Sequence, residues 1–314
     1  MTAKRRSPLS NNLVLSLDFG GTKLSAGLVD VGSGRLLALR RTATPPDAER
    51  SLAVMLELAR SLLDDEAGRA NSLGVSFGGL VDIDGRTVLR SHHVAGWDGY
   101  PLSARLESEF QLQARVTNDA DAVALGESCF GAGHCVRSLL YLTVSTGIGA
   151  GIILDGALYR GEHSLAGEIG HMFLLPDGPL CPCGRRGCLE ALASGRSIAR
   201  QMRQKLAEQG DLAVIEAITA KSVAEAAAVG NPSARSVWAE AMRWLGIGIA
   251  NAANVINPGR VVVGGGLARA GVLLFEPVQR IAAQVALDPA LQIVPAALGD
   301  DGPLLGAAVA AQAP

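Results

Sequence analysis

The same short pattern occurs twice in this chain of 314 residues, and it constrains the fold more than any other feature. An apolar run, 13–17, leads into the polar glycine turn DFGGTK at 18–23, and a second apolar run follows at once. Later, the apolar run 139–144 leads into STGIGAG at 145–151, and again an apolar run follows. Short apolar runs bounded by turn residues are typical of buried strands, so each turn is predicted to join two strands of a hairpin. We interpret the two hairpins as a duplicated unit.

Neither turn matches the common nucleotide-binding loops. In a Walker loop the glycines lead into a helix and the lysine precedes Ser or Thr, whereas Lys23 is followed by Leu24 and a predicted strand. The glycines at 147–151 have the wrong spacing for a dinucleotide fingerprint, and a strand rather than a helix follows. Glycines in such turns can leave backbone amides free to face phosphate. Taken alone, the first turn is better explained as an ordinary hairpin.

One histidine and three of the five cysteines lie close together, at His171, Cys181, Cys183 and Cys188. A Cys-x-Cys pair does not easily close as a disulfide, whereas three thiolates and one imidazole match a tetrahedral zinc site. Because all four positions are filled by protein, the pattern predicts a structural zinc rather than a catalytic one. The alternative is a cluster of small buried cysteines in a glycine-rich turn.

Two glycines inside this cluster, Gly184 and Gly187, are expected to let the backbone turn tightly between the ligands. The other cysteines, Cys129 and Cys135, have no ligand-like neighbours. We expect them to be buried and inert.

Composition favours a globular α/β protein and argues against several other classes. Hydrophobic residues make up 48% of the chain but aromatic residues only 4%, so aliphatic side chains must fill the core. A net charge of -2 gives no electrostatic reason to expect a nucleic-acid partner. The chain has no apolar stretch of signal-peptide length, and the uncharged run 138–154 is better explained by two strands than by a membrane span. With reduced cysteines, these features predict a cytoplasmic protein without a membrane partner.

Asn118 and Asp119 end a predicted strand and begin a helix that runs to about residue 130. Either side chain could simply cap that helix. A carboxylate at this place could also act as a general base. From the sequence alone the two interpretations stand equal.

Further along, helices are expected at 196–208, 221–228 and 235–256, and a buried strand at 261–263 opens into Gly264, Gly265 and Gly266. A glycine triplet at a strand end allows a flat ring to approach the backbone. The last segment, 303–311, is small and apolar, and we expect it to pack on the first strands, with Leu304 and Leu305 contacting residues numbered below about 120. A hinge is expected at 299–302.

In this order, the two glycine hairpins, the Asn-Asp pair and the His/Cys cluster resemble the ROK family (repressors, open reading frames, kinases) over residues 12–312. The resemblance implies an α/β fold of two actin-like ATPase lobes, ribonuclease H-like and duplicated, with a zinc knuckle. It implies a disordered tail at 1–11, a small lobe of 12–121 plus 302–314, and a large lobe of 122–301. The large lobe would carry the knuckle and the surface of a homodimer.

The resemblance also implies an activity. It is transfer of the γ-phosphoryl group of ATP to the 6-hydroxyl of a hexose, with glucose as the first choice of substrate. N-acetylmannosamine, N-acetylglucosamine and fructose kinases of the same family are the alternatives. A sugar-sensing transcriptional regulator is the alternative of another class; such regulators carry an N-terminal helix-turn-helix domain, for which residues 1–12 leave no room.

By resemblance, Asp119 is the catalytic base and Asp18 holds Mg²⁺ through water. The residues expected at the sugar are Gly79, Asn118, Asp119, Glu168, His171 and Glu190. Those expected at ATP are Asp18, Gly20, Gly21, Thr22, Lys23, Thr146 and Gly147 for the phosphates and Gly264, Gly265 and Gly266 for the adenosine. His171 would have two roles, with one ring nitrogen on zinc and the other toward the sugar. One departure is Gly78, where the family usually has proline, and we expect it to loosen that turn.

Overall fold

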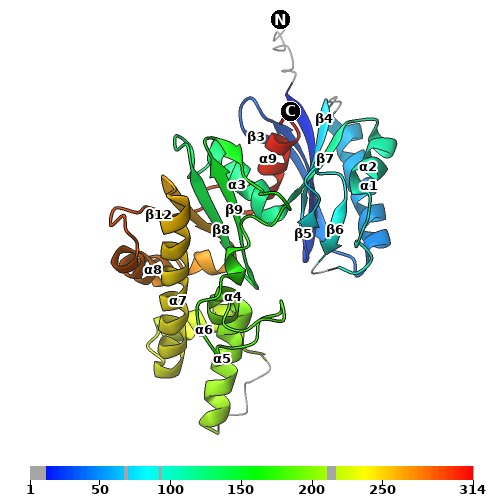
Figure 1. Cartoon of the computed structure of the whole chain (residues 1–314). Helices are drawn as coiled ribbons and strands as arrows, with labels where there is room; N and C mark the ends of the chain where they lie inside the picture. Colours follow the sequence, from blue (N-terminus) through cyan, green and yellow to red (C-terminus); the bar gives the residue numbers. More distant parts are fainter. Residues whose placement is uncertain (1–11, 67–69, 92–93, 211–216, 314) are drawn as a thin grey trace, which may run out of the picture. The chain divides into compact units, whose positions relative to one another are not determined.

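The computed structural model describes residues 12–66, 70–91, 94–210 and 217–313 (Figure 1). The tail at 1–11, which the sequence predicted to be disordered, lies outside the described residues. The chain divides into two compact units. Among the described residues, the first holds those within 1–130, 160–164 and 300–314, and the second those within 131–159 and 165–299.

The first unit is built on a five-stranded sheet with the order β3-β2-β1-β4-β7. β1 is antiparallel to β2 and parallel to β4, and β7 is parallel to β4. All seven residues of β1 are buried, as its apolar sequence predicts. The strands are β1 (Leu13–Phe19), β2 (Lys23–Asp30), β3 (Arg35–Ala43), β4 (Ser72–Phe77) and β7 (Ala114–Asn118), with a separate ribbon of β5 (Gly79–Val81) and β6 (Val88–Ser91).

Helices α1 (Ala48–Glu66) and α2 (Leu102–Phe110) lie on one face of this sheet, and α3 (Asp119–Phe130) and α9 (Gly302–Ala310) lie on the other (Figure 1). Successive side chains of a strand point to opposite faces of the sheet, toward α1 and α2 or toward α3 and α9. Leu15 and Leu17 of β1 join the core that contains α1, whereas the hydroxyl of Ser16 between them donates to the carbonyl of Leu304 in α9. The buried core thus has a continuous apolar layer on the α1 side and a mixed layer on the α9 side.

Small residues let α9 pack closely on its neighbours. A Cβ built at Gly74 of β4 would overlap the carbonyl of Ala307, and one built at Gly306 would overlap the carbonyl of Ala122 in α3. Leu304 packs beside Gly27 of β2. The end of the chain therefore returns to its first strands, where the sequence analysis expected it.

The second unit repeats the plan of the first. Its five-stranded sheet has the order β10-β9-β8-β11-β12. β8 is antiparallel to β9 and parallel to β11, and β11 is parallel to β12, so each sheet has a hairpin on one side of its first strand and parallel strands on the other. This is the duplication that the two glycine turns predicted. The strands are β8 (Leu139–Val144), β9 (Ile148–Leu154), β10 (Ala157–Leu158), β11 (Arg260–Gly264) and β12 (Ile293–Pro295).

The core of the second unit joins β8 and β11 to the long helix α7 (Pro232–Ile256). Asn231 caps this helix, Pro232 suits its first turn, and Asn257 ends it in the left-handed conformation.

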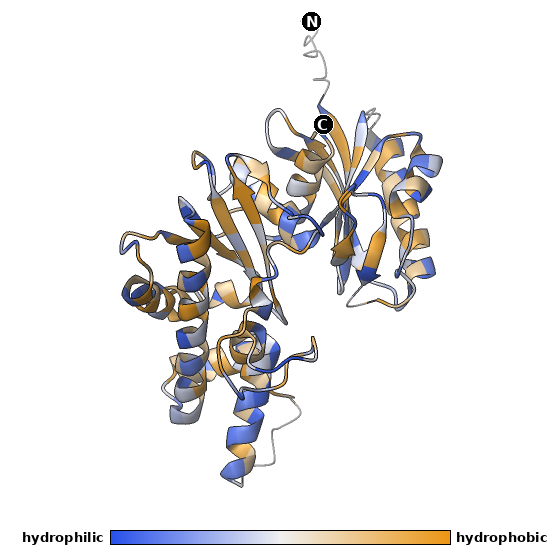
Figure 2. Ribbon diagram, viewed as in Figure 1, coloured by the Kyte–Doolittle hydropathy of each residue, from blue (hydrophilic) through white to orange (hydrophobic). Residues whose placement is uncertain are grey.

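Figure 2 shows apolar strands and a mostly polar α5. The remaining elements are η1 (Ile169–His171), α4 (Leu189–Ala193), α5 (Gly195–Glu208), α6 (Ala220–Ala228), η3 (Gly266–Ala270), α8 (Val272–Val285) and η4 (Gly299–Asp301).

Two features differ from the sequence expectations. Cys129 and Cys135 are exposed, because Cys129 lies at the end of α3 and Cys135 in the turn that follows, so the prediction that they are buried was wrong. The whole of α3 belongs to the first unit, where it packs against α9, and residues 160–164 belong there too, whereas residues 122–301 were expected to form the large lobe. Among the described residues, no helix is long and apolar enough to cross a membrane.

Candidate active site

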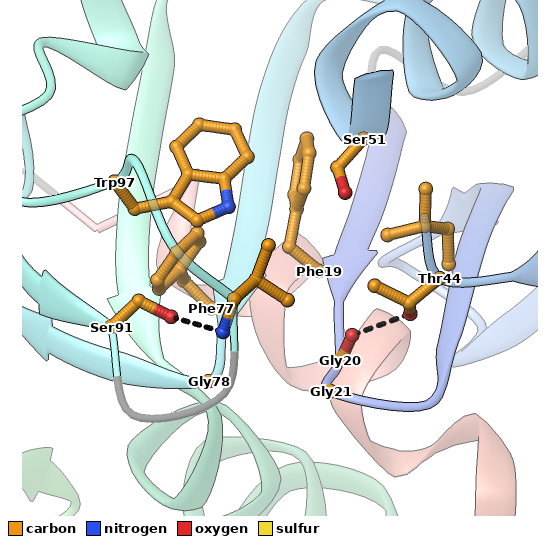
Figure 3. Close-up of a pocket in the computed structure, with 11 residues that line it drawn as sticks. Phe19, Gly20, Gly21, Thr44, Ser51, Phe77, Gly78, Ser91 and Trp97 are labelled. Carbon is orange, nitrogen blue, oxygen red and sulfur yellow. Dashed lines mark hydrogen bonds between the residues drawn. The ribbon is translucent and has the colours of Figure 1, made fainter. Parts of the chain in front are cut away.

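The first glycine turn joins β1 to β2 and is held from inside. The Gly20 amide donates to the Lys23 carbonyl over 3.2 Å, and the Thr44 hydroxyl donates to the Gly20 carbonyl over 2.7 Å (Figure 3). A Cβ at Gly20 would lie 2.9 Å from the Lys23 carbonyl oxygen, so this position requires glycine. The Gly20 amide therefore closes the turn in this conformation, although the sequence analysis expected it to face a phosphate.

Asp18 precedes this turn and is the most perturbed acid of the first unit. Its side chain is 5% exposed, and Oδ1 accepts a hydrogen bond from the Ser76 hydroxyl over 2.9 Å. Burial raises the pKa of Asp18 to about 7, against the opposing effect of the Ser76 hydrogen bond. The Asp119 carboxylate raises this pKa further, whereas Lys23 and Arg41 lower it. A buried carboxyl group with a strongly perturbed pKa is a candidate for a functional site.

Asn118 and Asp119 have separate roles in the structure. The Asn118 side-chain oxygen accepts from the amides of Ala120 and Asp121, over 2.9 and 3.2 Å, and so caps α3. Its Nδ2 donates to the Gly79 carbonyl over 2.9 Å, which ties the turn after β4 to the start of the helix. Asp119 is the first residue of α3, and its Oδ1 accepts from the Ala120 amide over 2.8 Å. The negative charge of Asp119 raises the pKa of Asp18, so the two carboxylates interact electrostatically.

A small apolar pocket lies beside these turns (Figure 3). Its volume of about 10 Å³ suffices for roughly one water molecule. Trp97 packs edge-on against Phe19 and Phe77, with ring centroids 5.4 and 5.3 Å apart, so it is a packing residue of the pocket wall. The Gly78 amide donates to the Phe19 carbonyl over 3.1 Å, a bond that proline at this place could not make.

The second glycine turn, between β8 and β9, is braced by the segment that follows the cysteines. The Ser145 amide donates to the Gly147 carbonyl over 2.9 Å, and the Ile148 amide donates to Glu190 Oε2 over 2.9 Å. A Cβ at Gly147 would lie 2.5 Å from that carboxylate oxygen. The start of α5 adds a bond from the Arg196 amide to the Thr146 carbonyl over 3.3 Å.

The glycine triplet at the end of β11 lies against the same turn. Gly265 has a φ of +84°, and a Cβ there would lie 2.6 Å from the Val144 carbonyl oxygen. A Cβ at Gly266 would be 3.4 Å from Ser145 Oγ. Gly264 packs against the Tyr141 hydroxyl. Side chains at these positions would push the two strand ends apart, so glycine is required for their close approach.

The four predicted zinc ligands come together. The ligand atoms of His171, Cys181, Cys183 and Cys188 all lie within 4.8 Å of one another. His171 Nδ1 is 3.6 Å from Cys181 Sγ, and the Sγ atoms of Cys183 and Cys188 are 3.7 Å apart. A tetrahedral zinc with ordinary bond lengths requires about 3.6 Å between nitrogen and sulfur and about 3.8 Å between two sulfurs. The residues therefore fit a zinc ion.

The backbone around this cluster is shaped by its glycines. Gly184 and Gly187 have φ values of +86° and +70°, as their place between ligands predicted, and a Cβ at Gly187 would overlap the Leu175 carbonyl. His171 turns Nδ1 toward the sulfurs, and its Nε2 lies 3.7 Å from the Glu168 carboxylate. Cys188 directly precedes α4, which carries Glu190. The cluster thus lies in the same short segment as Glu168 and Glu190.

The predicted site residues fall into two groups, one in each compact unit. Two residues beside the first group were not expected from the sequence: Ser76, which binds Asp18, and Asp300, which lies 3.1 Å from the Lys23 ammonium. A polar residue near the end of the otherwise apolar β4 was a signal for the first; nothing in the sequence indicated the second. The first unit holds Asp18, Gly20, Gly21, Thr22, Lys23, Gly79, Asn118 and Asp119, and the second holds Thr146, Gly147, Glu168, His171, Glu190 and the glycine triplet with the three cysteines.

Known proteins are similar to this chain over almost its whole length. A glucokinase of Streptomyces coelicolor is 33% identical over 316 residues, covering 96% of this chain and 98% of the glucokinase. An N-acetylmannosamine kinase of Salmonella typhi is 32% identical over 302 residues, covering 95% of this chain and 98% of that kinase. The crystal structure of a ROK family glucokinase from Streptomyces griseus in complex with glucose and AMPPNP is 34% identical, with a TM-score of 0.83 over 96% of this chain and 99% of that one. The ROK family model matches residues 14–313, and the chain therefore belongs to the ROK family.

Proposed function

We propose that this ROK sugar kinase is an ATP-dependent hexose kinase that phosphorylates the 6-hydroxyl of glucose. The observation that carries the proposal is the pairing of two acidic groups beside the first glycine turn, the buried Asp18 and Asp119 at the start of α3. Phosphoryl transfer needs a cation site near the phosphates and an acceptor for the hydroxyl proton, and this pair offers both. The similarity to glucokinases over nearly the full chain supports glucose as the substrate.

In this proposal, backbone and hydroxyl groups of the glycine turns bind the phosphates of ATP. The Gly20 amide is engaged within its own turn, so Gly21 and Thr22 would supply the contacts there, with Lys23 beside them. Thr146 and Gly147 would bind phosphate from the second turn, and Gly264, Gly265 and Gly266 would border the adenosine. Asp18 would hold Mg²⁺ through water, and the ion would neutralise charge on the phosphates when bound.

Asp119 would receive the proton of the 6-hydroxyl. As the hydroxyl oxygen bonds to the γ-phosphorus, the bond from that phosphorus to the bridging oxygen breaks, ADP leaves and the proton passes to the Asp119 carboxylate. Asn118 caps α3, which relieves Asp119 of that task. Gly79, Asn118, Glu168, His171 and Glu190 would bind the remaining sugar hydroxyls.

The His/Cys cluster would hold a structural zinc ion. Its distances fit zinc, and all four coordination positions are supplied by side chains. Because the Nε2 of His171 is turned away from the sulfurs and toward Glu168, this nitrogen is available to a sugar hydroxyl. The ion would therefore support the sugar-binding residues without taking part in the chemistry.

A coupled assay tests the proposal. Purified protein with Mg²⁺ and ATP is offered glucose, mannose, fructose, N-acetylmannosamine and N-acetylglucosamine, and ADP formation is recorded. We expect the highest kcat/KM with glucose. A higher kcat/KM with N-acetylmannosamine would replace the proposed substrate by that of the Salmonella relative, and no turnover with any of the five would overturn the proposal.

A further inference from the structure

A row of polar residues crosses the sheet of the first unit at Asp18. In the strand register Asp18 lies opposite Ser25 of β2 on one side and opposite Ser76 of β4 on the other. Thr117 of β7 lies opposite Ser76. Residues in register point to the same face of a sheet, so these side chains share the face covered by α9. The row is close to the end of β1, where the first glycine turn begins.

The two neighbours of Asp18 in this row are equally buried but differ in bonding. Ser76 is 0% exposed and Ser25 is 1% exposed. The Ser76 hydroxyl donates to Asp18 Oδ1 over 2.9 Å. Among the described residues, the Ser25 hydroxyl has no hydrogen-bond partner. Asp18 is thus held from the β4 side.

The hydrogen bond determines which way the carboxylate faces. With Oδ1 occupied by Ser76, Oδ2 is directed toward the glycine turn, 3.8 Å from a Cβ built at Gly20. The terminal torsion of an aspartate is broad, so its own rotamer preference does not determine the orientation of this carboxylate. The hydrogen bond from the Ser76 hydroxyl sets this torsion.

The two cations that act on Asp18, Lys23 and Arg41, are bound by other carboxylates. The Lys23 ammonium lies 3.1 Å from Asp300, and the Arg41 guanidinium donates to Asp301 over 2.7 Å. Asp119 repels the negative charge of Asp18 rather than orienting it. Neither cation therefore takes the place of the Ser76 hydroxyl.

We propose that Ser76 is a positioning residue for the kinase reaction: it holds the Asp18 carboxylate so that Oδ2 faces the phosphate-binding turn. This inference rests on the proposed function, in which Asp18 serves Mg²⁺ and ATP. Ser76 itself touches neither substrate. Residues that orient a metal-binding group in this way typically contribute 10- to 100-fold in metal affinity or activity.

The test compares Ser76→Ala with two matched variants. Ser25→Ala removes a hydroxyl on the other side of Asp18, and Ser16→Ala removes a buried hydrogen bond on the same strand, made to the Leu304 carbonyl. We expect Ser76→Ala to weaken the binding of Mg²⁺·AMPPNP in calorimetry, and to lower kcat/KM for Mg²⁺·ATP, by about 10- to 100-fold, with the KM for the sugar unchanged. Ser25→Ala and Ser16→Ala should keep both values, and Ser76→Thr, which keeps the hydroxyl, should restore them.

Thermal unfolding separates positioning from stability. If Ser76→Ala and Ser16→Ala lose similar stability but only the first loses affinity for Mg²⁺·AMPPNP, the loss is one of orientation. In an Asp18→Ala background, Ser76→Ala should cause no further loss of affinity, because the group that it orients is gone.

Two outcomes overturn the inference: unchanged nucleotide binding in Ser76→Ala, or an equal loss in Ser16→Ala or Ser25→Ala. A wild-type protein without kinase activity on any hexose would instead overturn the proposed function. The two failures are therefore distinguishable.

Discussion

At the scale of single residues, the structure separates two neighbours that the sequence could not. From the sequence, either Asn118 or Asp119 could cap α3, and a capping and a catalytic role stood equal. The Asn118 oxygen accepts the two amides that a cap should accept, and its amide also binds the Gly79 carbonyl. Asp119 is therefore not needed as the cap, and its charge acts on Asp18.

The first prediction concerns the separate roles of Asn118 and Asp119. Asp119→Asn should lower kcat by about two to four orders of magnitude, because loss of a general base has that effect, while the melting temperature changes little. Asn118→Ala should instead destabilise the protein, by about 1 kcal/mol for the lost cap. Steady-state kinetics and thermal unfolding of both variants check this. If Asp119→Asn turns over at a near-normal rate, Asp119 is not the base.

The second prediction concerns the pH dependence of stability. The folded protein raises the pKa of Asp18 to about 7 from its ordinary 3.8, mainly through burial, so the folded state binds this proton more tightly than the unfolded state does. The contribution of Asp18 to stability therefore falls as the pH rises between these two values and stays low above about pH 7. Asp18→Asn should remove this fall, and the variant should be more stable than the wild type at pH 8.

Urea unfolding without Mg²⁺, from pH 5 to pH 8, measures this difference. The gain in stability of Asp18→Asn should increase with pH while its kinase activity is lost. A gain that does not depend on pH would mean that Asp18 is not protonated in the folded protein at pH 5.

At the scale of elements, the segment from η1 to α4 contains little regular secondary structure and is held by scattered backbone hydrogen bonds, such as the one from the Leu174 amide to the Gly187 carbonyl. η1 and α4 have three and five residues. Bridges between Phe173 and Cys188 and between Leu180 and Arg186 are isolated. A metal bound by the His/Cys cluster would cross-link this segment further.

The third prediction concerns the zinc ion expected at the His/Cys cluster. Elemental analysis should find about one zinc per chain, as one four-ligand site implies. Cys183→Ser should lower the zinc content, the melting temperature and the affinity for the sugar together, since Glu168 and Glu190 lie at the two ends of the segment. Cys135→Ser, an exposed cysteine outside the cluster, is the control and should change none of them. Full activity in a metal-free protein would contradict the supporting role of zinc.

At the scale of the whole molecule, two sheets with the same strand order are built from one chain, and the last helix completes the first unit. α9 packs on β1, β2, β4 and β7 as well as on α3. Its closest contacts are made where glycine faces a neighbouring carbonyl, at Gly74 and Gly306. The first unit is therefore incomplete until the end of the chain has folded back onto it.

The fourth prediction tests the close packing of α9 against α3. In an exposed helix, replacing glycine by alanine stabilises by roughly 0.5–1 kcal/mol. Gly306→Ala should do the opposite, because the added methyl group would overlap the Ala122 carbonyl of α3. Urea unfolding of the variant gives the sign directly, and an increase in stability would show that α3 and α9 can move apart at no cost.

The sequence by itself determined the duplicated hairpins, most of the long helices and the four residues of the His/Cys cluster, because each of these depends on local pattern or on spacing. Apolar runs with glycine turns specify strands wherever they occur, and His171 with its three cysteines is recognisable without a fold. The return of α9 could be expected from its small apolar side chains, since only such a helix can pack so closely on strands.

Only the tertiary structure decided which polar residues face one another. Ser76 meets Asp18 because β1 and β4, far apart in the chain, pair in parallel in one particular register, and a shift by one residue would place Ser76 on the other face. The high pKa of Asp18 arises from the layers that bury it, and the exposure of Cys129 from the way α3 ends. Burial and register are properties of packed elements, and no local stretch of sequence contains them.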